Sequence, residues 1–358
     1  MCLYKLEHLL ISNSIDINTY QLILDEFSSK TPFYSLEYLD HNKSGNLSYF
    51  VFKKHNKPLA LLPIYLNPSP NKFNDIQYYD AISPYGYSGP LYQDVISENE
   101  ITLFWNYVDQ WYLKNNVITE FIRFSLNNNY LNYSGLLIPS LKNITGELTS
   151  YNEIWSNFKQ KVRNNYRKAL SSKLSIKIYY KEISLKHIRE FYNIYINTMI
   201  RKEATDSFFH DIDYFVNLIN NNKSNVILAI VYKQSLPVST ELILTVNKKL
   251  YSYLGGTMET FFDCRPNDYL KNEIIKWAID NNFDFYCLGG GRKDLDGLYH
   301  YKKSFFPKDK EEIYYTGRKV INRKIYNLLL SEHNLNYEEL EHLITIPKIY
   351  FPFYKPQT

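Results

Sequence analysis

The sequence predicts an α/β fold with mixed sheets, built from two tandem modules that are related by an internal repeat. Segments 50–66 and 230–246 each show a β-strand pattern, a polar turn, a proline and a second strand, which is typical of an antiparallel hairpin. The prolines of the two segments, Pro58 and Pro237, lie half the length of the chain apart. The composition, with 45% hydrophobic and 22% charged residues over 358 positions, is that of a globular chain and excludes a largely disordered one.

In each module the hairpin is followed by a helix and a further strand. After the first hairpin, apolar residues recur at helical spacing over 97–116, and a strand-like run follows at 120–126. After the second hairpin, the same order appears in the helical segment 268–282 and the strand 283–288. The first copy also holds extra residues between hairpin and helix, in the insert 80–94. An excess in one copy of a repeat predicts a feature that is specific to that copy.

The remaining segments complete the predicted domain order. Residues 136–149 are interpreted as a loose connection, Ser150 is placed to cap a helix, and 185–202 form another helix. Segment 326–343 is interpreted as a helical pair, and 347–358 as an extended surface tail rich in Pro and Tyr. We therefore expect an N-terminal module over 1–145, a C-terminal module with the catalytic site over 146–325, and a C-terminal extension over 326–358.

Charge and cysteine content narrow the function classes. Lys and Arg number 41 and Asp and Glu 37, so the net charge of +4 indicates no strong polyanionic partner by itself. Cys2, Cys264 and Cys287 are too few and too scattered for a disulfide framework or a zinc site, so we expect no metal and a reduced, cytoplasmic location. No apolar run reaches the ~18–20 residues of a membrane-spanning helix. The apolar N-terminal run contains Glu7 and His8, unlike a secretory signal.

Two features of the sequence are candidates for ligand binding. In the insert, glycines would let the backbone approach a ligand closely, and Tyr85 and Tyr87 offer rings and hydroxyls; the alternative is a rigid loop over a sheet edge. Further on, a predicted helix carries a basic face that could grip the phosphate of a nucleotide sugar, a coenzyme or RNA. The alternative for that face is a solvated helix surface. Its cations are Lys159, Lys161, Arg163, Arg167, Lys168 and Lys173.

Three further features could take part in chemistry. Arg201, near the end of a predicted helix, either binds a phosphate in a pocket or interacts only with the helix dipole. A strand ending in Gly289, Gly290 and Gly291, followed by Arg292, could cradle an oxyanion or a donor phosphate with Lys302 behind it, or could be a plain turn. It matches neither the P-loop nor the dinucleotide fingerprint. Glu241, an acid within an apolar strand, is either paired, solvated or a general base.

In their order along the chain, these segments resemble the Fem-type branch of the GNAT acyltransferase superfamily. The motifs are short, and the resemblance spans residues 30–325. They are Tyr-Gly-Tyr-Ser-Gly-Pro at 85–90, the basic series at 161–169, Thr-Met-Ile-Arg at 198–201, Tyr-Ser-Tyr-Leu-Gly-Gly at 251–256 and Tyr-Lys-Lys-Ser-Phe-Phe at 301–306.

The resemblance implies transfer of an acyl or aminoacyl group to an amine, often on a cell-wall or glycan precursor that carries a nucleotide diphosphate. By the same resemblance, Lys302 would stabilise charge near the reacting centre, and Asp94 would fall near an acidic catalytic group. The acceptor phosphate and sugar would be held by Arg201, Tyr253, Tyr85 and Tyr87.

The sequence also departs from the family pattern. Ordinary GNAT enzymes have an Arg/Gln-x-x-Gly-x-Gly/Ala motif before the helix that binds the coenzyme A pyrophosphate, and residues 257–267 lack it. The long coiled-coil arm of some Fem-type proteins has no counterpart either.

Three hypotheses remain open at this point. The leading one is an N-acyltransferase that uses acetyl-CoA or a similar donor, with no tightly bound cofactor, on the amine of an amino sugar or cell-envelope glycan precursor. The second takes its acyl group from an aminoacyl-tRNA and binds the RNA through Lys159–Lys173. The third is a non-catalytic module of the same fold that binds a glycan or a nucleotide. No DNA partner is expected.

Overall fold

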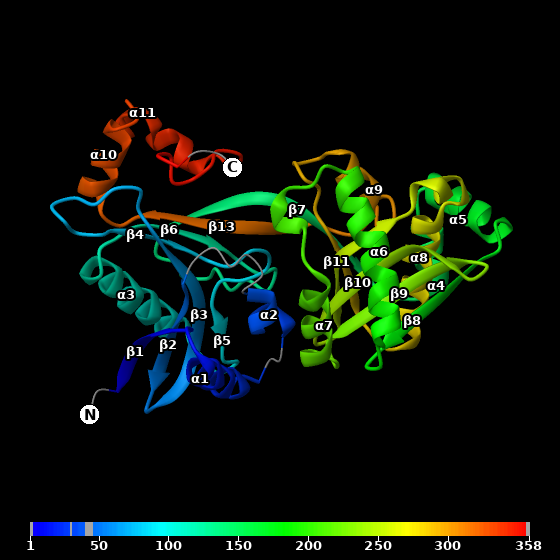
Figure 1. Cartoon of the computed structure of the whole chain (residues 1–358), viewed down its shortest axis with the longest axis horizontal. Coiled ribbons are helices and arrows are strands. Elements are labelled where there is room, and N and C mark those ends of the chain that lie inside the picture. The colour runs from blue at the N-terminus through cyan, green and yellow to red at the C-terminus, as the bar shows by residue number, and fades with distance from the viewer. Residues whose placement is uncertain (1–2, 29–30, 40–45, 356–358) are drawn as a thin grey trace. The chain divides into compact units, whose positions relative to one another are not determined.

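The computed structural model describes residues 3–28, 31–39 and 46–355, and the chain divides into two compact units (Figure 1). Unit 1 comprises Met1–Tyr34, Asn42–Ser140 and Ile313–Thr358, and unit 2 comprises Ser35–His41 and Leu141–Glu312. The chain passes between the units within strands β7 (Leu136–Glu147) and β13 (Glu312–Val320).

The sheet of unit 1 has the strand order β1-β2-β3-β4-β6-β13, with β5 paired to β3. Neighbours are antiparallel except β4 and β6, which run parallel. The elements, besides β13, are β1 (Tyr4–Leu10), α1 (Ser14–Asp25), η1 (Pro32–Tyr34), β2 (Asn46–Lys54), β3 (Lys57–Pro68), β4 (Tyr79–Ile82), β5 (Leu91–Tyr92), α3 (Glu98–Lys114), β6 (Val117–Arg123), α10 (Arg323–Ser331), α11 (Tyr337–Leu340) and η4 (Glu341–Thr345).

Helix α3 supplies much of the core of unit 1. It begins with a capping box, in which the Ser97 side chain accepts from the Glu100 amide and the Glu100 side chain accepts from the Ser97 amide. Its apolar face, including Phe104 and Trp105, is fully buried against side chains of β2, β3 and β6. The helix predicted over 97–116 is therefore present.

The C-terminal segment belongs to the core of unit 1, in contrast to the predicted separate extension and surface tail. Phe351 and Tyr354 are buried in a cluster with Tyr326 of α10. The buried Arg318 of β13 donates hydrogen bonds to four carbonyls, those of Ile344, Ile346, Pro347 and Ile349. A chain end that satisfies a buried guanidinium is integrated into the fold. For residues 347–355 sequence periodicity gave no sign of this, because they have neither helical nor strand spacing.

Unit 2 contains a second mixed sheet, with the strand order β7-β12-β11-β10-β9-β8. Only β11 and β12 pair in parallel; the other neighbours are antiparallel. The elements, besides β7, are α2 (Leu36–Leu39), α4 (Tyr151–Asn157), α5 (Gln160–Ser171), β8 (Leu174–Tyr180), α6 (Leu185–Arg201), η2 (Asp206–Phe208), α7 (Ile212–Asn221), β9 (Val226–Lys233), β10 (Leu236–Val246), β11 (Lys249–Thr257), η3 (Glu259–Cys264), α8 (Pro266–Asp280), β12 (Phe285–Gly289) and α9 (Gly297–Lys303).

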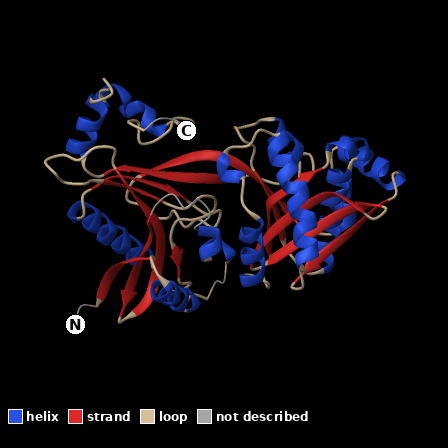
Figure 2. Ribbon diagram, in the orientation of Figure 1, coloured by secondary structure: helices blue, strands red, loops and turns tan. Residues whose placement is uncertain are grey.

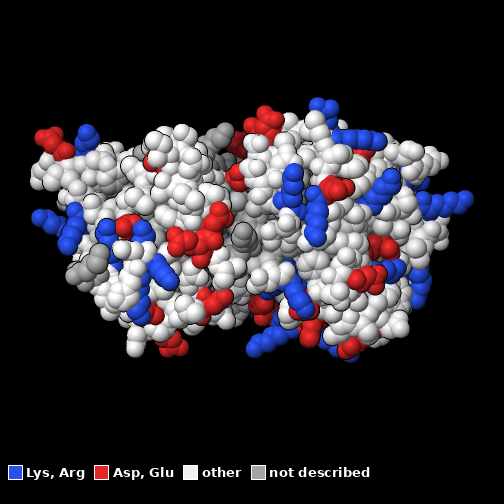
Figure 3. Space-filling view, turned by 90° about the horizontal axis from the view of Figure 1, so that it is seen from below, with Lys and Arg blue, Asp and Glu red and all other residues white. Residues whose placement is uncertain are grey.

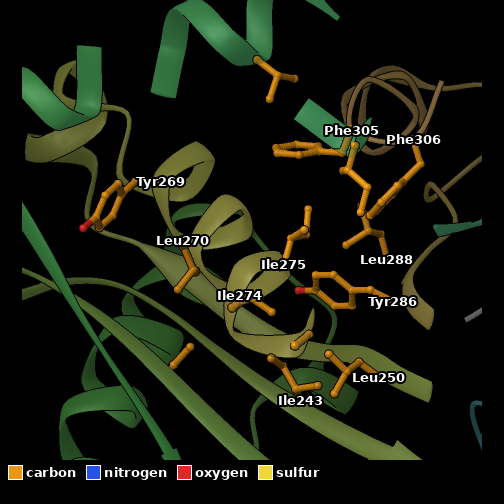
Figure 4. Close-up of a cluster of buried hydrophobic side chains, with 14 of the residues drawn as sticks. Ile243, Leu250, Tyr269, Leu270, Ile274, Ile275, Tyr286, Leu288, Phe305 and Phe306 are labelled. Carbon is orange, nitrogen blue, oxygen red and sulfur yellow. The ribbon is translucent and has the colours of Figure 1, made fainter. Parts of the chain in front are cut away.

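The main core of unit 2 lies between its sheet and helices α4, α5 and α8. Alternate residues of β9, including Ile227 and Ala229, contribute to this cluster together with Ile274 and Ile275 of α8. Figure 4 shows these helix side chains beside Tyr286 of β12, and Figure 2 shows the strands of the unit as a layer covered by helices. The intervening residues of β9 point to the other face because side chains alternate along a strand.

The two units share one order of elements, which confirms the predicted two-module architecture. In each, a hairpin and a third antiparallel strand are followed by a helix and then by a strand that pairs in parallel with the third. These are β2-β3-β4-α3-β6 in unit 1 and β9-β10-β11-α8-β12 in unit 2.

The boundaries differ from the predicted ones. Most of residues 136–149, predicted to be a loose connection, forms β7, and the boundary between the units falls at Ser140 instead of 145. Unit 2 ends at Glu312 because β13 pairs with β6 of unit 1 from Thr316 to Val320. Within the described residues, no helix is long and apolar enough to cross a membrane.

Candidate functional site

Strands β11 and β12 part after a short stretch of pairing. Among the described residues, their backbone pairing is confined to Lys249, Leu250 and Tyr251 of β11, opposite residues 285–287 of β12. Strand β11 then continues to Thr257 along β10, whereas the end of β12 at Gly289 pairs with β7. The diverging ends lie where side chains from β10, β11, α8 and α9 gather, and the site is built on them.

Lys302 lies in helix α9, next to the end of β12. The helix starts at the Asp296 N-cap, whose carboxylate accepts from the Tyr299 amide at 2.8 Å. The Lys302 ammonium donates to the carbonyl oxygen of Gly290 at 2.6 Å. Burial, followed by the positive charge of Lys271, lowers the pKa of Lys302 to about 8. A lysine titrating near neutrality can both carry positive charge and exchange a proton.

Glu241 of β10 is buried and paired, which is one of the states that its sequence context left open. Its carboxylate forms an ion pair with Lys271 of α8 and accepts a hydrogen bond from the Tyr286 hydroxyl. The Lys271 ammonium also donates to Ser252 at 3.0 Å and to the Tyr286 hydroxyl at 3.2 Å. Burial and then the Glu241 charge raise the pKa of Tyr286 far above its usual value, so this phenol stays protonated.

The glycine run after β12 forms a tight turn whose following amides are already used. Gly289 has a φ of +75°, which favours glycine. The Asp296 carboxylate accepts from the amides of Arg292 and Lys293 at 2.8 and 3.1 Å. A Cβ on Gly291 would lie 2.1 Å from that carboxylate. A donor phosphate at these amides would therefore have to displace Asp296.

The basic helix predicted to grip phosphate is α5, and its cations differ in availability. Arg163 donates to the carbonyls of Phe158 and Ser156, so it caps the end of α4. Arg167 bonds the Asn164 side chain at 3.2 Å and lies over the ring of Trp155. Lys161, Lys168 and Lys173 are exposed.

The start of helix α8 is poorly suited to a pyrophosphate. Pro266, at the first turn, has no amide hydrogen to offer. Asp268, also in the first turn, is buried and accepts from the Asn165 amide of α5 at 3.2 Å. Burial raises its pKa. A carboxyl group at a helix N-terminus already occupies the position where an anionic ligand would be stabilised.

Two predicted acceptor-binding residues lie elsewhere in unit 2. Arg201, at the end of α6, donates to the Thr257 carbonyl at 2.9 Å and stacks over the Phe262 ring. Tyr253 of β11 shares a hydrogen bond of 2.7 Å with the Tyr214 hydroxyl. Arg201 is thus attached to the end of β11 through the Thr257 backbone, whereas the side chain of Tyr253 joins β11 to α7.

The other predicted candidates belong to unit 1. Tyr85 is exposed, and the Arg123 guanidinium lies 5.8 Å from its ring centre. Tyr87 packs edge-on against Phe33 and Tyr314. Asp94 accepts from the Ser28 hydroxyl at 2.7 Å. The insert is held by its own hydrogen bonds, since Ser88 donates to the carbonyls of Pro84 and Arg123, so it is a rigid loop with one exposed ring.

Sequence reasoning missed Lys271 and Tyr286. A usable signal was present for Lys271, because it shares a helix face with Ile274, Ile275 and Ala278, where a charged residue is out of place. Tyr286 gave no signal, since tyrosine is common throughout this chain.

Comparisons with known proteins find relatives over the part of the chain that holds this site. The acetyltransferase (GNAT) domain family matches residues 156–303, which include α5, the parted strands and Lys302. A UDP-N-acetylmuramoylpentapeptide-lysine N(6)-alanyltransferase of Weissella viridescens is 24% identical over 152 residues, 42% of this chain and 44% of that protein. The match thus spans less than half the length of that relative. Residues 156–303 are thus similar to a GNAT acetyltransferase domain, and the chain is a transferase with a fold like that of FemX.

Solved structures show how far the fold is shared. The crystal structure of FemX matches 90% of this chain and 99% of its own, with a TM-score of 0.60 and 13% identity. The C-terminal domain of a putative lysylphosphatidylglycerol synthetase from Agrobacterium fabrum matches 86% and 92%, with a TM-score of 0.57 and 10% identity. Both likenesses cover nearly the whole chain, so both modules share this fold.

Proposed function

We propose that this chain is an aminoacyltransferase that moves an aminoacyl group from an aminoacyl-tRNA to a primary amine of a cell-envelope precursor. The observation that carries the proposal is the partly buried Lys302 against the Gly290 carbonyl, beside the parted strands within the matched GNAT domain. The named activity of the Weissella viridescens relative, transfer of an alanyl group to a lysine amine, supports the same reaction class.

The start of α8 favours an aminoacyl-tRNA donor over coenzyme A, in contrast to our leading expectation from sequence. A proline and a buried aspartate occupy the helix turn at which a pyrophosphate would need free amides and no competing carboxylate. A nearby surface instead suits a polyanion that binds through its backbone. The exposed cations Lys161, Lys168 and Lys173 lie on α5 and just after it, and α5 contacts α8 through the bond from Asn165 to Asp268.

Figure 3 shows Lys and Arg side chains projecting at the end of unit 2 where α5 and β8 lie in Figure 1. Exposed cations continue beyond α5 in β8 and at the start of α6, with Lys177, Lys186 and Arg189. We assign this surface to the RNA. Because charged tRNA is cytoplasmic, the proposed reaction takes place there.

The proposed chemistry forms one C–N bond and breaks one ester C–O bond. The neutral acceptor amine attacks the ester carbonyl, and the proton it loses ends on the departing ribose hydroxyl. Lys302, as an ammonium, stabilises the negative charge of the tetrahedral intermediate or donates a proton to the leaving oxygen. Arg201, Tyr253, Tyr85 and Tyr87 remain our proposed contacts for the acceptor, and Asp94 the proposed acidic group.

Transfer of label from a charged donor to an acceptor tests the proposal. The pure chain is incubated with tRNA charged with a mixture of ¹⁴C-labelled amino acids, or separately with ¹⁴C-acetyl-CoA, and with a lysine-containing UDP-N-acetylmuramoyl pentapeptide. We expect label on the acceptor from aminoacyl-tRNA, and a loss of at least about 10²-fold in rate for Lys302→Met, the size typical of one lost charge-stabilising donor. Labelling from acetyl-CoA alone would reverse the donor assignment.

The RNA surface has a test of its own. Replacing Lys161, Lys168 and Lys173 together by Gln should weaken tRNA binding and flatten its salt dependence, by about 0.7 in log–log slope for each lost contact to single-stranded RNA. The matched control replaces three exposed lysines of unit 1, Lys57, Lys72 and Lys114. Equal losses in the two triple variants would mean that binding is set by net charge and not by this surface.

A further inference from the structure

A closed set of side-chain bonds joins four elements at the point where the sheet of unit 2 opens. Glu241 of β10, Lys271 of α8 and Tyr286 of β12 bond one another, and Ser252 of β11 accepts from the same lysine. Ser252 and Tyr286 lie next to the last backbone pairs of β11 and β12. Figure 4 shows the Tyr286 hydroxyl directed toward the helix that carries Ile274 and Ile275, which is also the helix of Lys271.

This set of bonds uses every donor of the Lys271 ammonium. The Lys271 ammonium has three hydrogens and three partners, Glu241, Ser252 and Tyr286. Both oxygens of Glu241 are occupied as well. The side chains of Lys271 and Glu241 are only 7% and 4% exposed. A buried charged pair with fully used hydrogen bonds costs desolvation energy, so its presence in a site calls for a reason other than stability.

We propose that Glu241, Lys271 and Tyr286 form a positioning unit for Lys302, which holds the opening between β11 and β12 where β12 leads to Gly290, the residue whose carbonyl Lys302 binds. The inference rests on the proposed function for the role of Lys302. Lys271 acts on the reaction only through that lysine, because it has no free donor.

Charged groups on several elements around Lys302 change the pKa of its ammonium. Lys271 of α8 opposes its positive charge, whereas Glu241 of β10, Cys287 of β12 and Asp296 at the start of α9 favour it. Among these charges Lys271 has the largest effect. The Glu241 carboxylate is bound to Lys271, and it offsets only part of the effect of that lysine on Lys302. The ion pair as a whole therefore lowers the pKa of Lys302.

The two charged members of the unit should therefore shift Lys302 in opposite directions. Lys271→Met removes a neighbouring cation and leaves a carboxylate, so the pKa of Lys302 should rise. Glu241→Gln leaves the cation unopposed, so the pKa of Lys302 should fall. We expect each displacement to be roughly one pH unit, the size typical of a nearby charge. Tyr286→Phe removes a hydrogen bond and no charge, and should leave that pKa in place.

The double variant Lys271→Met/Glu241→Gln keeps the inference testable if the single variants fail to fold. Exchanging both members of a buried ion pair is commonly tolerated, whereas removal of one partner is costly. Because Lys271 acts on Lys302 more strongly than Glu241 does, the double variant should still raise the pKa of Lys302, by less than Lys271→Met alone.

Trace acetylation measures the Lys302 pKa without any substrate. The folded chain and its variants are treated with a trace of acetic anhydride over pH 6–11, and the labelling of the peptide carrying Lys302 is followed by mass spectrometry. The pH dependence of aminoacyl transfer is measured in parallel, and its alkaline limb should move in the same order: Glu241→Gln lowest, then wild type, the double variant and Lys271→Met.

The two readouts separate this inference from the proposed function. Labelling curves that shift in the stated order support the positioning unit even if no aminoacyl transfer is found, in which case the proposed function alone fails. Labelling curves that coincide in all variants that fold, or that shift in one common direction for both single variants, would overturn the inference. A purely structural unit would reduce activity equally at every pH and move neither limb nor labelling curve.

Discussion

At the scale of single residues, the partly buried ammonium of Lys302 should lower the free energy of unfolding of the chain. Burial lowers the pKa of Lys302 to about 8 from the ordinary lysine value of 10.5. Between these pH values the unfolded chain binds more protons than the folded one, so stability rises with pH across this window; the penalty is fully present below pH 8 and absent above pH 10.5. Lys302→Met should therefore raise the free energy of unfolding at pH 7 by up to ~3 kcal/mol. Urea unfolding at pH 7 to 10.5 measures this gain, which should shrink as the pH rises.

The neighbouring lysine provides the control for this measurement. Lys303→Met removes the same charge from the same helix, but Lys303 is paired with Glu311 at 2.9 Å and bonds the Asp309 carbonyl. It should lower stability slightly or leave it unchanged. The Lys302 variant also loses the bond to the Gly290 carbonyl, which offsets part of its gain. A gain from Lys302→Met that is constant over the whole pH range would contradict a buried, proton-linked lysine.

Single residues also show how far a site can be predicted from sequence. Lys302 and Glu241 were predicted as candidate site residues, Lys302 by resemblance and Glu241 as an acid in an apolar strand. Both lie at the candidate site of unit 2. Arg163 was predicted to be available for a phosphate, but it caps α4. The spacing of residues in the sequence does not show that a side chain reaches across the turn between two helices. The carboxylate of Asp296 that closes the glycine turn was likewise invisible, since only the fold brings it back onto the amides of Arg292 and Lys293.

At the scale of elements, the approach of the loop after α9 to strand β7 depends on one glycine. A Cβ on Gly146 would lie 2.1 Å from the ring of Phe306, which is 2% exposed and cannot easily move. Gly146→Ala should therefore cost about 1–3 kcal/mol of stability, the usual cost of overpacking a core. Thermal unfolding should show a lower Tm, by about 2–4 °C for each kcal/mol.

Gly297→Ala is a matched control for Gly146→Ala, because its expected effect on stability has the opposite sign. It lies in the first turn of α9, and a Cβ there would meet nothing within 4 Å. Gly297→Ala should raise stability by about 0.4–1 kcal/mol, because alanine reduces the entropy of the unfolded chain. If both alanine variants shifted the Tm in the same direction, the close packing of Phe306 on β7 would not govern this region.

Elements with strong periodicity were predicted well, and the exceptions have a physical reason. Helices α3, α6 and α8 and the hairpin β9-β10 lie within a few residues of their predicted bounds. Strand β7 was taken for a loop, because it combines a proline, polar residues and a glycine and is held mainly by its neighbours. Strand β13 was not recognised either, because Arg318 and Lys319 interrupt its apolar pattern and are satisfied only by partners distant in sequence.

At the scale of the whole molecule, the sequence predicted the internal repeat but not the return of the chain to unit 1. The order of hairpin, helix and strand appears twice in the sequence and twice in the fold. The return of the last segment to unit 1 depends on contacts over long sequence separations, such as Tyr354 with Asp80. No local pattern encodes such contacts, so the module boundary at 325 missed the observed end of unit 2 at Glu312.

This chain path predicts that a substitution in β13 affects unit 1 and spares unit 2. Arg318→Met would remove the hydrogen bonds that Arg318 donates to the four carbonyls, at a cost of about 1–3 kcal/mol for buried polar groups that lose a partner. The tryptophans report on the units separately, because Trp105 and Trp111 lie in unit 1 and Trp155 and Trp277 in unit 2. Two Trp→Phe double variants, each retaining the pair of one unit, therefore give a fluorescence signal for each unit.

Urea titration of these two reporters, with and without Arg318→Met, decides the point. We expect the midpoint of the unit 1 signal to fall while the unit 2 signal, and with it the integrity of the Lys302 site, stays in place. The conservative Arg318→Lys should not restore the midpoint, because a single ammonium cannot span carbonyls at Ile344 and Ile349 as the planar guanidinium does. An equal fall in both signals would mean that the units unfold as one cooperative body, and that the C-terminal segment stabilises the transferase module as much as its partner.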